Sequence, residues 1–455
     1  MSPDAFLGAT QINQPIVWYL IIGILLILMG LMGSVLQRLP LSPAMIYLAI
    51  GFSLGPAGLN LIDLNPVHNV WVLTLLAEVA VLISLFAVGL RLRVRLADRI
   101  WLLPWRLGVI AMLITIGLLT AVGVYLLKLP LGAALLLAAI LAPTDPVLAS
   151  DVQIQDVGDR DRIRFSLSGE GGLNDGTTYP FIMAGLFLLG VDEARDYGTI
   201  GSGLLHALWG IGAGLLTGWL MGRTVVRLVL FLRQKYHEAL GMEEFLALGL
   251  IALSYATSHY VHGIGFLAVF AAGVAMRGIE HTASGQAGPA EVIGAISIGE
   301  VSDVSTHPEK APAYMAEIVL AFNHQLEHIV EFIMVLLVGI MLSGSGFSTE
   351  GFIVAGLLLL VIRPVSSLAS LAGAKATPMQ RRLMAWFGIR GIGSLYYLMY
   401  ALQYEPQANL EHRLIPIVLT VIATSIVIHG ISATPLMALY YKRTSWRRDT
   451  GQSGS

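Results

Sequence analysis

Long apolar stretches separated by short polar connections recur along the whole chain. A hydrocarbon core of about 30 Å takes roughly 20 apolar residues as an α-helix, and the chain contains about thirteen such stretches. The pattern predicts an all-α polytopic membrane protein whose connections are too short for a second domain. The predicted spans begin near Pro15, Pro43, Asn69, Trp105, Leu131, Phe165, Thr199, Met242, His262, Ala313, Gly351, Arg382 and Leu414.

Basic residues distinguish the two sides of the predicted bundle, because Lys and Arg concentrate in the cytoplasmic connections of membrane proteins. If the N-terminus lies outside, the outward connections contain only Lys128, Arg195 and Arg413. Arg363 and Arg390 fall within spans, and the other basic residues fall on the inward side. We therefore predict a multi-pass protein of the cell (inner) membrane with its N-terminus outside and its C-terminus in the cytoplasm.

The order of the spans suggests how the chain is organised. The first fourteen residues contain no basic residue, which is untypical of a cleaved signal peptide, so we expect the first span to be retained. We expect two transmembrane repeats, 1–190 with spans one to six and 242–441 with spans eight to thirteen, linked by a seventh span in 191–241. Residues 442–455 form a predicted cytoplasmic tail, and 278–312 are the longest polar connection, a candidate regulatory segment.

Composition agrees with a protein embedded in lipid and excludes several classes of function. Hydrophobic residues make up 56% and charged residues 12% of the chain, whereas a soluble domain carries about 25% charged residues. The 27 basic and 29 acidic residues give a net charge of −2, so we expect no nucleic-acid partner. The absence of cysteine excludes disulfides, thiolate metal sites and cysteine nucleophiles. We expect a protein that is not an enzyme and has no resident cofactor.

Five ionisable side chains fall at predicted bilayer depth, where each costs roughly 2.5–3.5 kcal/mol on insertion scales. Such groups need a partner or a water-filled cavity. Two arginines can neutralise two of the three carboxylates, which leaves one negative charge for an exchangeable cation. The five residues are Asp145, Glu170, Asp175, Arg363 and Arg390.

The fifth span contains a predicted helix break. Pro143 and Pro146 each remove a backbone donor and clash with the preceding turn. Unpaired backbone groups at membrane depth must then be satisfied by an ion, water or a polar side chain. Asp145 lies between the prolines and either caps a half-helix or contacts an ion directly, and both interpretations stay open.

The twelfth span contains a second weak point. Gly388, Gly391 and Gly393 lower helix propensity by roughly 1 kcal/mol each relative to Ala. If the chain has two repeats, the fifth and twelfth spans correspond, and interrupted helices at matching places indicate a transport site. We expect Arg390 to compensate the exposed carbonyl ends. Close helix packing explains the glycines but not an arginine between them.

The sixth span carries acidic residues near its middle. Glu170 and Asn174 are four residues apart and share a helix face, while Asp175 lies about 100° further round. In a span that starts at Phe165, Asp175 falls near the centre of the bilayer. The two acids are therefore predicted to line an ion pathway. A further acid, Glu78 in the third span, is assigned to packing.

Four motifs in this order resemble the NhaP/NHE branch of the monovalent cation/proton antiporters, over almost the whole chain. The resemblance implies about thirteen helices in two inverted repeats with two broken, crossing helices, and a homodimer that exchanges Na⁺ or Li⁺ for H⁺. It also implies that Glu170 pairs with Arg363 through Asn174. The motifs are Thr144-Asp145-Pro146, Glu170 followed by Asn174-Asp175, Arg363 in Ile-Arg-Pro, and Gly388-Ile-Arg390-Gly391.

The same resemblance implies the ligands of the transported ion. Asp175 would bind either the cation or the proton, and Thr144 and Asp145 would contact Na⁺ beside it. The chain has Gly171 where members of this family commonly have serine, so one side-chain oxygen is missing from the expected coordination shell. Water or a nearby hydroxyl such as that of Ser168 would have to replace it.

An exchange mechanism follows from these positions. Burial favours the uncharged form of a carboxyl group, so proton and Na⁺ can compete for Asp175. If only the occupied site crosses the barrier, each inward cation is coupled to an outward one. Because Asn174 stands in place of a second aspartate and Arg363 neutralises Glu170, we expect one-for-one, electroneutral exchange.

The tenth span provides an alternative function. His324, Glu327 and His328 fit the H-x-x-E-H pattern of inverted zinc peptidases, since two histidines four apart can bind zinc on one helix face. The same stripe continues through Glu317 and Glu331, as expected for a helix bordering an aqueous funnel or sensing pH. A K⁺/H⁺ antiporter of the same fold and a cation channel are further alternatives that use the same acids.

Overall fold

The computed structural model describes most of the chain, and no strand occurs among the described residues. These residues are 42–95, 97–148, 161–197, 199–236, 242–285, 287–294, 310–404 and 410–449, with the separate positions 19–20, 23–24, 26–27, 30, 152, 154 and 307. The helices are α3 (Pro43–Leu54), α4 (Val70–Arg91), η1 (Arg99–Trp101), α5 (Leu102–Trp105), η2 (Arg106–Ala111), α6 (Met112–Tyr125), α7 (Leu131–Leu141), α8 (Arg162–Leu188), η4 (Asp192–Tyr197), α9 (Ile200–Tyr236), α10 (Glu243–Tyr260), α11 (Gly265–Ser284), α12 (Pro289–Ile293), α14 (Ala311–Ser345), α15 (Thr349–Leu357), η5 (Leu358–Ile362), α16 (Arg363–Ser370), α17 (Pro378–Trp386), α18 (Ile392–Leu402) and α19 (Glu411–Asp449).

The helices coincide with the predicted spans from the second span onward, whereas the first predicted span, near Pro15, lies largely outside the described residues. Six helices in the described part of the chain are long and apolar enough to cross a membrane. Three shorter apolar helices, α3, α7 and α18, accompany them. The chain is thus an all-helical, multi-pass membrane protein, as its hydropathy predicts.

Several helix ends differ from the predicted ones. The fourth span starts at Arg99, not near Trp105, because the Asp98 side chain accepts a hydrogen bond from the Ile100 N–H and caps the first turn. α8 likewise starts at Arg162, where Asp161 acts as the cap. α19 continues to Asp449, beyond the residue at which the predicted tail begins.

Three basic residues that the sequence assigns to inward connections are buried within helices. Arg91, Arg233 and Arg277 are buried, and each forms an ion pair with a glutamate from another helix. They link neighbouring helices and are not loop charges. Their partners are Glu327, Glu243 at 2.5 Å and Glu317 at 3.0 Å, respectively.

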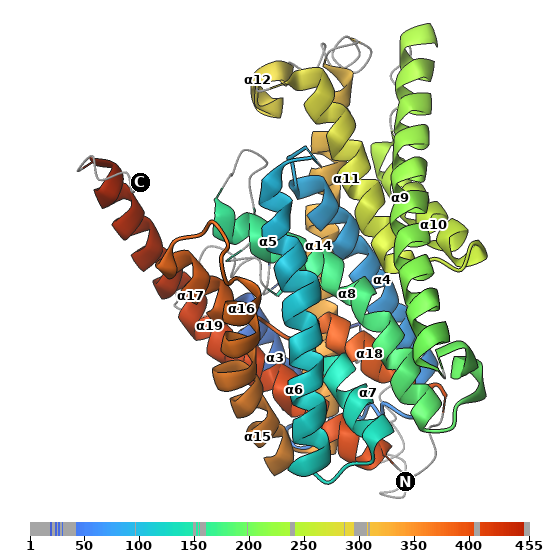
Figure 1. Ribbon diagram of the computed structural model, residues 1–455, viewed down its shortest axis with the longest axis vertical. Coiled ribbons are helices and arrows are strands. Elements are labelled where there is room, and N and C mark those ends of the chain that lie inside the picture. The colour runs from blue at the N-terminus through green and yellow to red at the C-terminus, as the bar shows by residue number, and fades with distance from the viewer. Residues whose placement is uncertain are drawn as a thin grey trace, which may run out of the picture.

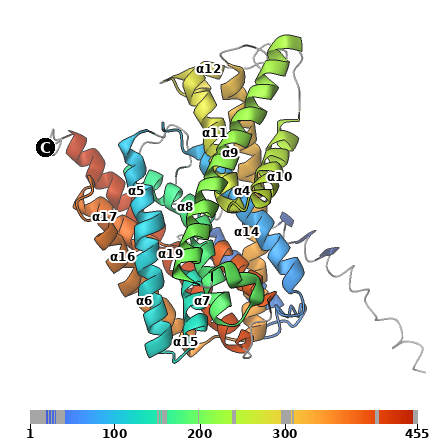
Figure 2. The same ribbon diagram turned by 45° about the vertical axis from the view of Figure 1, so that its right-hand side comes forward.

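The bundle has two sides and a polar centre. α9 stands at one edge in Figure 1, and α15 and α16 stand at the opposite edge. A Cβ at Gly218 of α9 would collide with the Ala268 carbonyl of α11, so this glycine permits close helix packing. Both views place α6 beside α16 (Figures 1 and 2), where the Thr115 hydroxyl donates to Ser366 Oγ at 2.9 Å. α4, α8, α14 and α18 pack between the edges and contain buried polar residues, among them Asp175 of α8 and Glu327 of α14.

Candidate functional site

The two predicted helix breaks are present, and they meet. After α7 the chain is not helical through residues 142–148, and between α17 and α18 it is not helical through residues 387–391. The Asp145 N–H donates to the Ile389 carbonyl at 2.8 Å, so the backbones of the two breaks bond directly to each other. This contact satisfies backbone groups that a broken helix leaves unpaired.

Asp145 holds the crossing together. Its Oδ1 accepts hydrogen bonds from the N–H groups of Val147 at 2.8 Å and Leu148 at 3.1 Å. Its Oδ2 accepts one from the N–H of Ile392, the first residue of α18. The carboxylate is 2% exposed and carries its negative charge at the positive end of a half-helix. Of the two interpretations open from the sequence, the capping one describes these contacts.

Asp175 lies in the middle of α8 beside the second break. The residue is 1% exposed, and its Oδ1 has no hydrogen-bond partner among the described residues. Gly393 faces it so closely that a Cβ there would lie 2.8 Å from Oδ1. The Tyr397 hydroxyl donates to the main-chain carbonyl of Asp175. A buried carboxylate oxygen without a protein donor is free to accept a proton, a cation or a water hydrogen bond.

Thr144 and Asn174 connect the first break to α8. The Asn174 amide donates to Thr144 Oγ1 at 2.8 Å, and both residues are buried. Asn174 Oδ1, like Asp175 Oδ1, has no partner in the described part of the chain. Two unsatisfied oxygens on consecutive residues of α8 are therefore available as ligands.

Glu170 and Arg363 form the predicted buried ion pair, but Asn174 does not mediate it. Arg363 reaches both carboxylate oxygens directly, with Nη2 at 2.9 Å from Oε2. Its Nη2 also donates to the carbonyls of Met384 at 3.0 Å and Phe387 at 2.7 Å, at the end of α17. The expectation of a bridge through Asn174 is wrong, because that amide is engaged by Thr144.

The Arg390 side chain bonds to one backbone carbonyl of its own break. Its Nη1 donates to the Gly388 carbonyl at 2.9 Å, and its backbone N–H donates to Ser425 Oγ at 2.9 Å. Arg390 forms no ion pair among the described residues, although it is fully buried. It therefore places one positive charge in the second break, whose backbone bonds to the first break that holds Asp145.

The glycine at position 171 has a packing reason. A Cβ at Gly171 would lie 3.1 Å from the Cβ of Pro146 and 3.4 Å from the Thr144 carbonyl oxygen. α8 and the first break thus approach closely where the family resemblance leads one to expect a serine. A cavity of about 10 Å³, lined by Thr144, Asp145 and Gly388 among others, adjoins this contact, and this is roughly enough to admit one water molecule.

The histidine stripe of α14 does not support the zinc peptidase alternative. Glu327 forms an ion pair with Arg91, so its carboxylate is neutralised. His324 and His328 contact each other with their Nε2 atoms 3.2 Å apart, and His328 lies 3.8 Å from Glu331. Among the described residues, no group of three or more His, Cys, Asp or Glu side chains could hold a metal ion.

Glu78 contacts two tyrosines, which its assignment to packing did not predict. This acid lies inside α4, and its carboxylate accepts a hydrogen bond from the Tyr255 hydroxyl of α10 and one at 3.5 Å from Tyr396 of α18. Five other charged residues were identified because they are ionisable side chains within apolar spans. The same criterion identifies Glu78.

Comparisons with known proteins show which proteins this chain is similar to. The sequence model of the family described as "Sodium/hydrogen exchanger, transmembrane" matches residues 23–292. A curated relative, the K(+)/H(+) antiporter NhaP of Alkalimonas amylolytica, is 25% identical over 427 residues, which are 92% of this chain and 66% of the relative. The chain thus spans just under two thirds of that relative's length.

Solved structures show the same fold. The sodium proton antiporter MjNhaP1 from Methanocaldococcus jannaschii at pH 8 matches with a TM-score of 0.66 and 16% identity, over 94% of this chain and 97% of that one. An electron-microscopy structure of the same antiporter matches with a TM-score of 0.63 and 18% identity, over 96% and 97% of the two chains.

Proposed function

Because the chain belongs to the sodium/hydrogen exchanger family, we propose that it exchanges Na⁺ or Li⁺ for H⁺ across the membrane, one for one, by alternating access. The observation that carries this proposal is the Asp175 carboxylate, which is buried in the middle of α8 and has an oxygen without a hydrogen-bond partner among the described residues. A proton and a cation compete for that oxygen, so one leaves when the other arrives.

The neighbouring groups complete the ion site. Asn174 Oδ1 is the second buried oxygen without a described partner, and Thr144 and Asp145 lie at the adjoining break. The Asp145 carboxylate is anchored by three backbone N–H groups, so its position stays fixed while Asp175 changes its occupant. We propose that these residues contact the cation together with Asp175.

The charges of the crossing support electroneutral exchange. Arg363 neutralises Glu170 through a direct ion pair, and the charge of Arg390 in the second break offsets that of Asp145 in the first, to which the second break is bonded. Asp175 then supplies the one uncompensated negative charge of these five residues. One Na⁺ or one H⁺ cancels it, so both loaded forms of the site carry the same charge through the membrane.

Movement of the loaded site gives alternating access. An empty Asp175 presents a bare carboxylate to a low-dielectric barrier, which is costly, whereas the occupied site is neutral. The crossing joins α7, α8 and α18 through the backbone and side-chain bonds described above, so these helices carry the site as a unit. We propose that the protein works as a homodimer in the cell membrane, with the C-terminus in the cytoplasm, and contributes to pH homeostasis.

Exchange through Asp175 is tested in proteoliposomes by following a pH gradient after addition of Na⁺, Li⁺ or K⁺. We expect Asp175→Asn to abolish exchange while the protein inserts and elutes as the wild type does. Asp192→Asn, which removes an exposed carboxylate outside the spans, is the matched control and should exchange normally. Retained exchange in Asp175→Asn would remove this residue from the central role.

The same assay identifies the transported cation. The curated relative's name favours K⁺, and Gly171 in place of serine changes the ligand set, so a K⁺/H⁺ antiporter is the second candidate. Dissipation of the gradient by K⁺ alone would select that candidate. An imposed membrane potential tests the stoichiometry, because one-for-one exchange must proceed at a rate independent of voltage.

A further inference from the structure

A large basic cavity lies apart from the helix crossing. It has a volume of about 730 Å³ and opens between the connection after α4, the start of α5 and α8, the end of α11, and the loop before α17. Among its described lining residues six are basic and one, Asp98, is acidic. The basic residues are Arg93, Arg95, Arg99, Arg106, Arg162 and Lys375.

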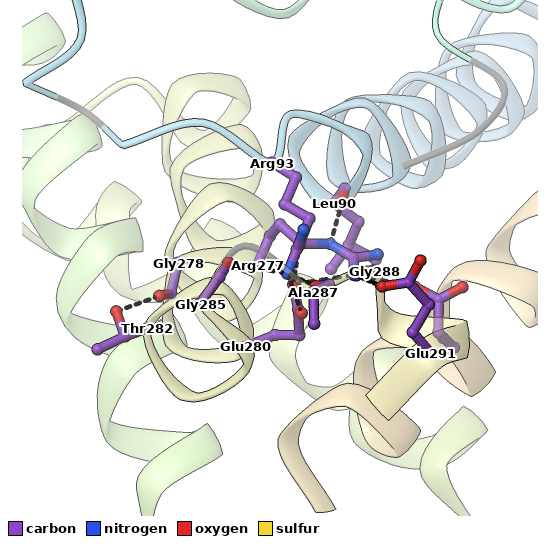
Figure 3. Close-up of polar contacts among 11 residues, drawn as sticks. Leu90, Arg93, Arg277, Gly278, Glu280, Thr282, Gly285, Ala287, Gly288 and Glu291 are labelled. Atoms are coloured by element: carbon purple, nitrogen blue, oxygen red, sulfur yellow. Dashed lines mark hydrogen bonds and ion pairs between the residues drawn. The ribbon is translucent and has the colours of Figure 1, made fainter. Parts of the chain in front are cut away.

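One of these bases is already neutralised. Arg93 donates to both carboxylate oxygens of Glu280, at 2.8 and 2.9 Å, and to the carbonyls of Ala287 at 2.8 Å and Gly285 at 3.4 Å. Figure 3 shows Arg93 pointing from the end of α4 into the polar cluster at the end of α11, beside Arg277. Arg93 therefore fixes one wall of the cavity.

Two more bases of the cavity bond to backbone carbonyls and keep spare donors. Arg106 Nη1 donates to the Ala372 carbonyl at 2.9 Å, and Arg162 Nη1 donates to the Lys375 carbonyl at 2.8 Å. These bonds to neutral carbonyls hold the loop before α17, and neither arginine forms an ion pair with another described residue. A guanidinium has five N–H donors, so each can still bind an anion.

The remaining bases have no counter-ion among the described residues. Arg95, Arg99 and Lys375 are exposed, and in the described part of the chain their side chains form no ion pair and no hydrogen bond. In the described lining, five positive charges without an ion-pair partner thus surround the cavity, against one carboxylate. The Asp98 carboxylate is itself engaged by the Ile100 N–H at 3.0 Å.

The cavity does not suit a cation. A concave surface lined by like charges concentrates ions of the opposite sign and repels ions of the same sign, so this cavity is a poor entrance for Na⁺ or H⁺. It also shares no lining residue with the small cavity beside Thr144 and Asp145. The general preference for basic residues on one side of a membrane protein does not require them to converge on one cavity.

We propose that this cavity binds an anion that carries at least two negative charges on phosphate groups. Guanidinium groups match phosphate oxygens in a bidentate geometry, and lysine adds a point charge. The volume falls within the range of about 300–1,000 Å³ that is usual for small-molecule sites. The shared chemistry is a polyphosphate group, which either a soluble polyphosphate or a phosphorylated lipid headgroup provides. The site does not depend on the exchange reaction proposed above.

Binding is measured on the purified full chain with two probes. In detergent, tripolyphosphate is titrated by calorimetry. In nanodiscs, phosphatidylcholine alone is compared with phosphatidylcholine containing phosphatidylinositol 4-phosphate, and lipid retained by the protein is quantified. The test variant combines Arg95→Gln, Arg99→Gln and Lys375→Gln. The control combines Arg227→Gln, Lys235→Gln and Arg443→Gln, which removes three exposed charges outside the cavity.

We expect the dissociation constant for at least one probe to rise by about tenfold or more in the test variant, because each lost charge-assisted hydrogen bond is worth about one factor of ten. The control should bind as the wild type does. A response to tripolyphosphate assigns a soluble ligand, and a response confined to the lipid assigns a headgroup. Equal affinities of the test and control variants for both probes would overturn the proposal. If the triple variant aggregates, Arg95→Gln and Lys375→Gln are compared singly with Arg227→Gln.

Discussion

The direct ion pair between Glu170 and Arg363 makes a quantitative prediction about stability. The two side chains are 2% and 3% exposed, so removal of one partner leaves the other charge buried. Such a loss costs about 3–5 kcal/mol. Arg363→Met also removes the donor to the carbonyls of Met384 and Phe387. We therefore expect Arg363→Met to destabilise more than Glu170→Leu, which leaves those two hydrogen bonds in place.

A double variant separates the interaction energy of the ion pair from the effects of the surrounding groups. When Glu170→Leu and Arg363→Met are combined, no charge is left unpaired, and apolar replacements of a buried ion pair are often neutral or stabilising. We expect the double variant to be more stable than the sum of the single losses implies, by at least about 2 kcal/mol. The assay is unfolding of the purified protein in mixed micelles by increasing sodium dodecyl sulfate.

The same molecule supplies a control pair. Glu350 and Arg413 are also joined in a bidentate way, at 2.6 and 2.8 Å, but their side chains are 37% and 39% exposed. Exposed pairs contribute about 0.2–1 kcal/mol. When Glu350 and Arg413 are replaced singly and together, the stability loss of the double variant should therefore be close to the sum of the single losses. If the stability losses of Glu170→Leu and Arg363→Met add up to that of the double variant within about 0.5 kcal/mol, the two residues are not strongly coupled and the reasoning is refuted.

Three further substitutions test the crossing. In Gly393→Ala the new Cβ displaces the Asp175 carboxylate, and we expect the half-saturating cation concentration in everted vesicles to rise by about tenfold or more. In Gly171→Ser a hydroxyl is added close to Pro146, and we expect the ratio of Na⁺ to K⁺ half-saturation to change by about threefold or more. Tyr397→Phe leaves the Asp175 carbonyl without its hydroxyl donor, and we expect the free energy of unfolding to fall by about 1–3 kcal/mol.

Each of these substitutions has a matched reference. In Gly249→Ala the added Cβ would have no neighbouring atom within 4 Å, so this variant should leave the cation affinity unchanged. The cation affinity of Gly393→Ala must differ from it. Gly171→Ala adds the Cβ without the hydroxyl, and an equal change of preference would contradict the role of an added oxygen. Tyr397→Phe with wild-type stability would show that its hydrogen bond contributes nothing.

The sequence by itself determined the elements of this protein. Spans follow from hydropathy, and the breaks follow from Pro143, Pro146 and the glycines around Arg390, because lipid requires continuous helices and these residues act within their own segment. The position of Asp175 near the middle of its span is equally local. Helix ends were less predictable, since a capping aspartate such as Asp98 lengthens a helix by its own hydrogen bond.

Only the tertiary structure decided which groups became partners. Asn174 bonds Thr144, 30 residues away, and does not mediate the contact of Glu170 with Arg363, which is 193 residues away. Arg91 lies at the end of its span as an inward charge in the sequence but is buried against an α14 glutamate in the fold. The physical reason is that a charged side chain in a low-dielectric bundle bonds to whatever group packing brings within reach. That group comes from the arrangement of distant helices, which no local pattern contains.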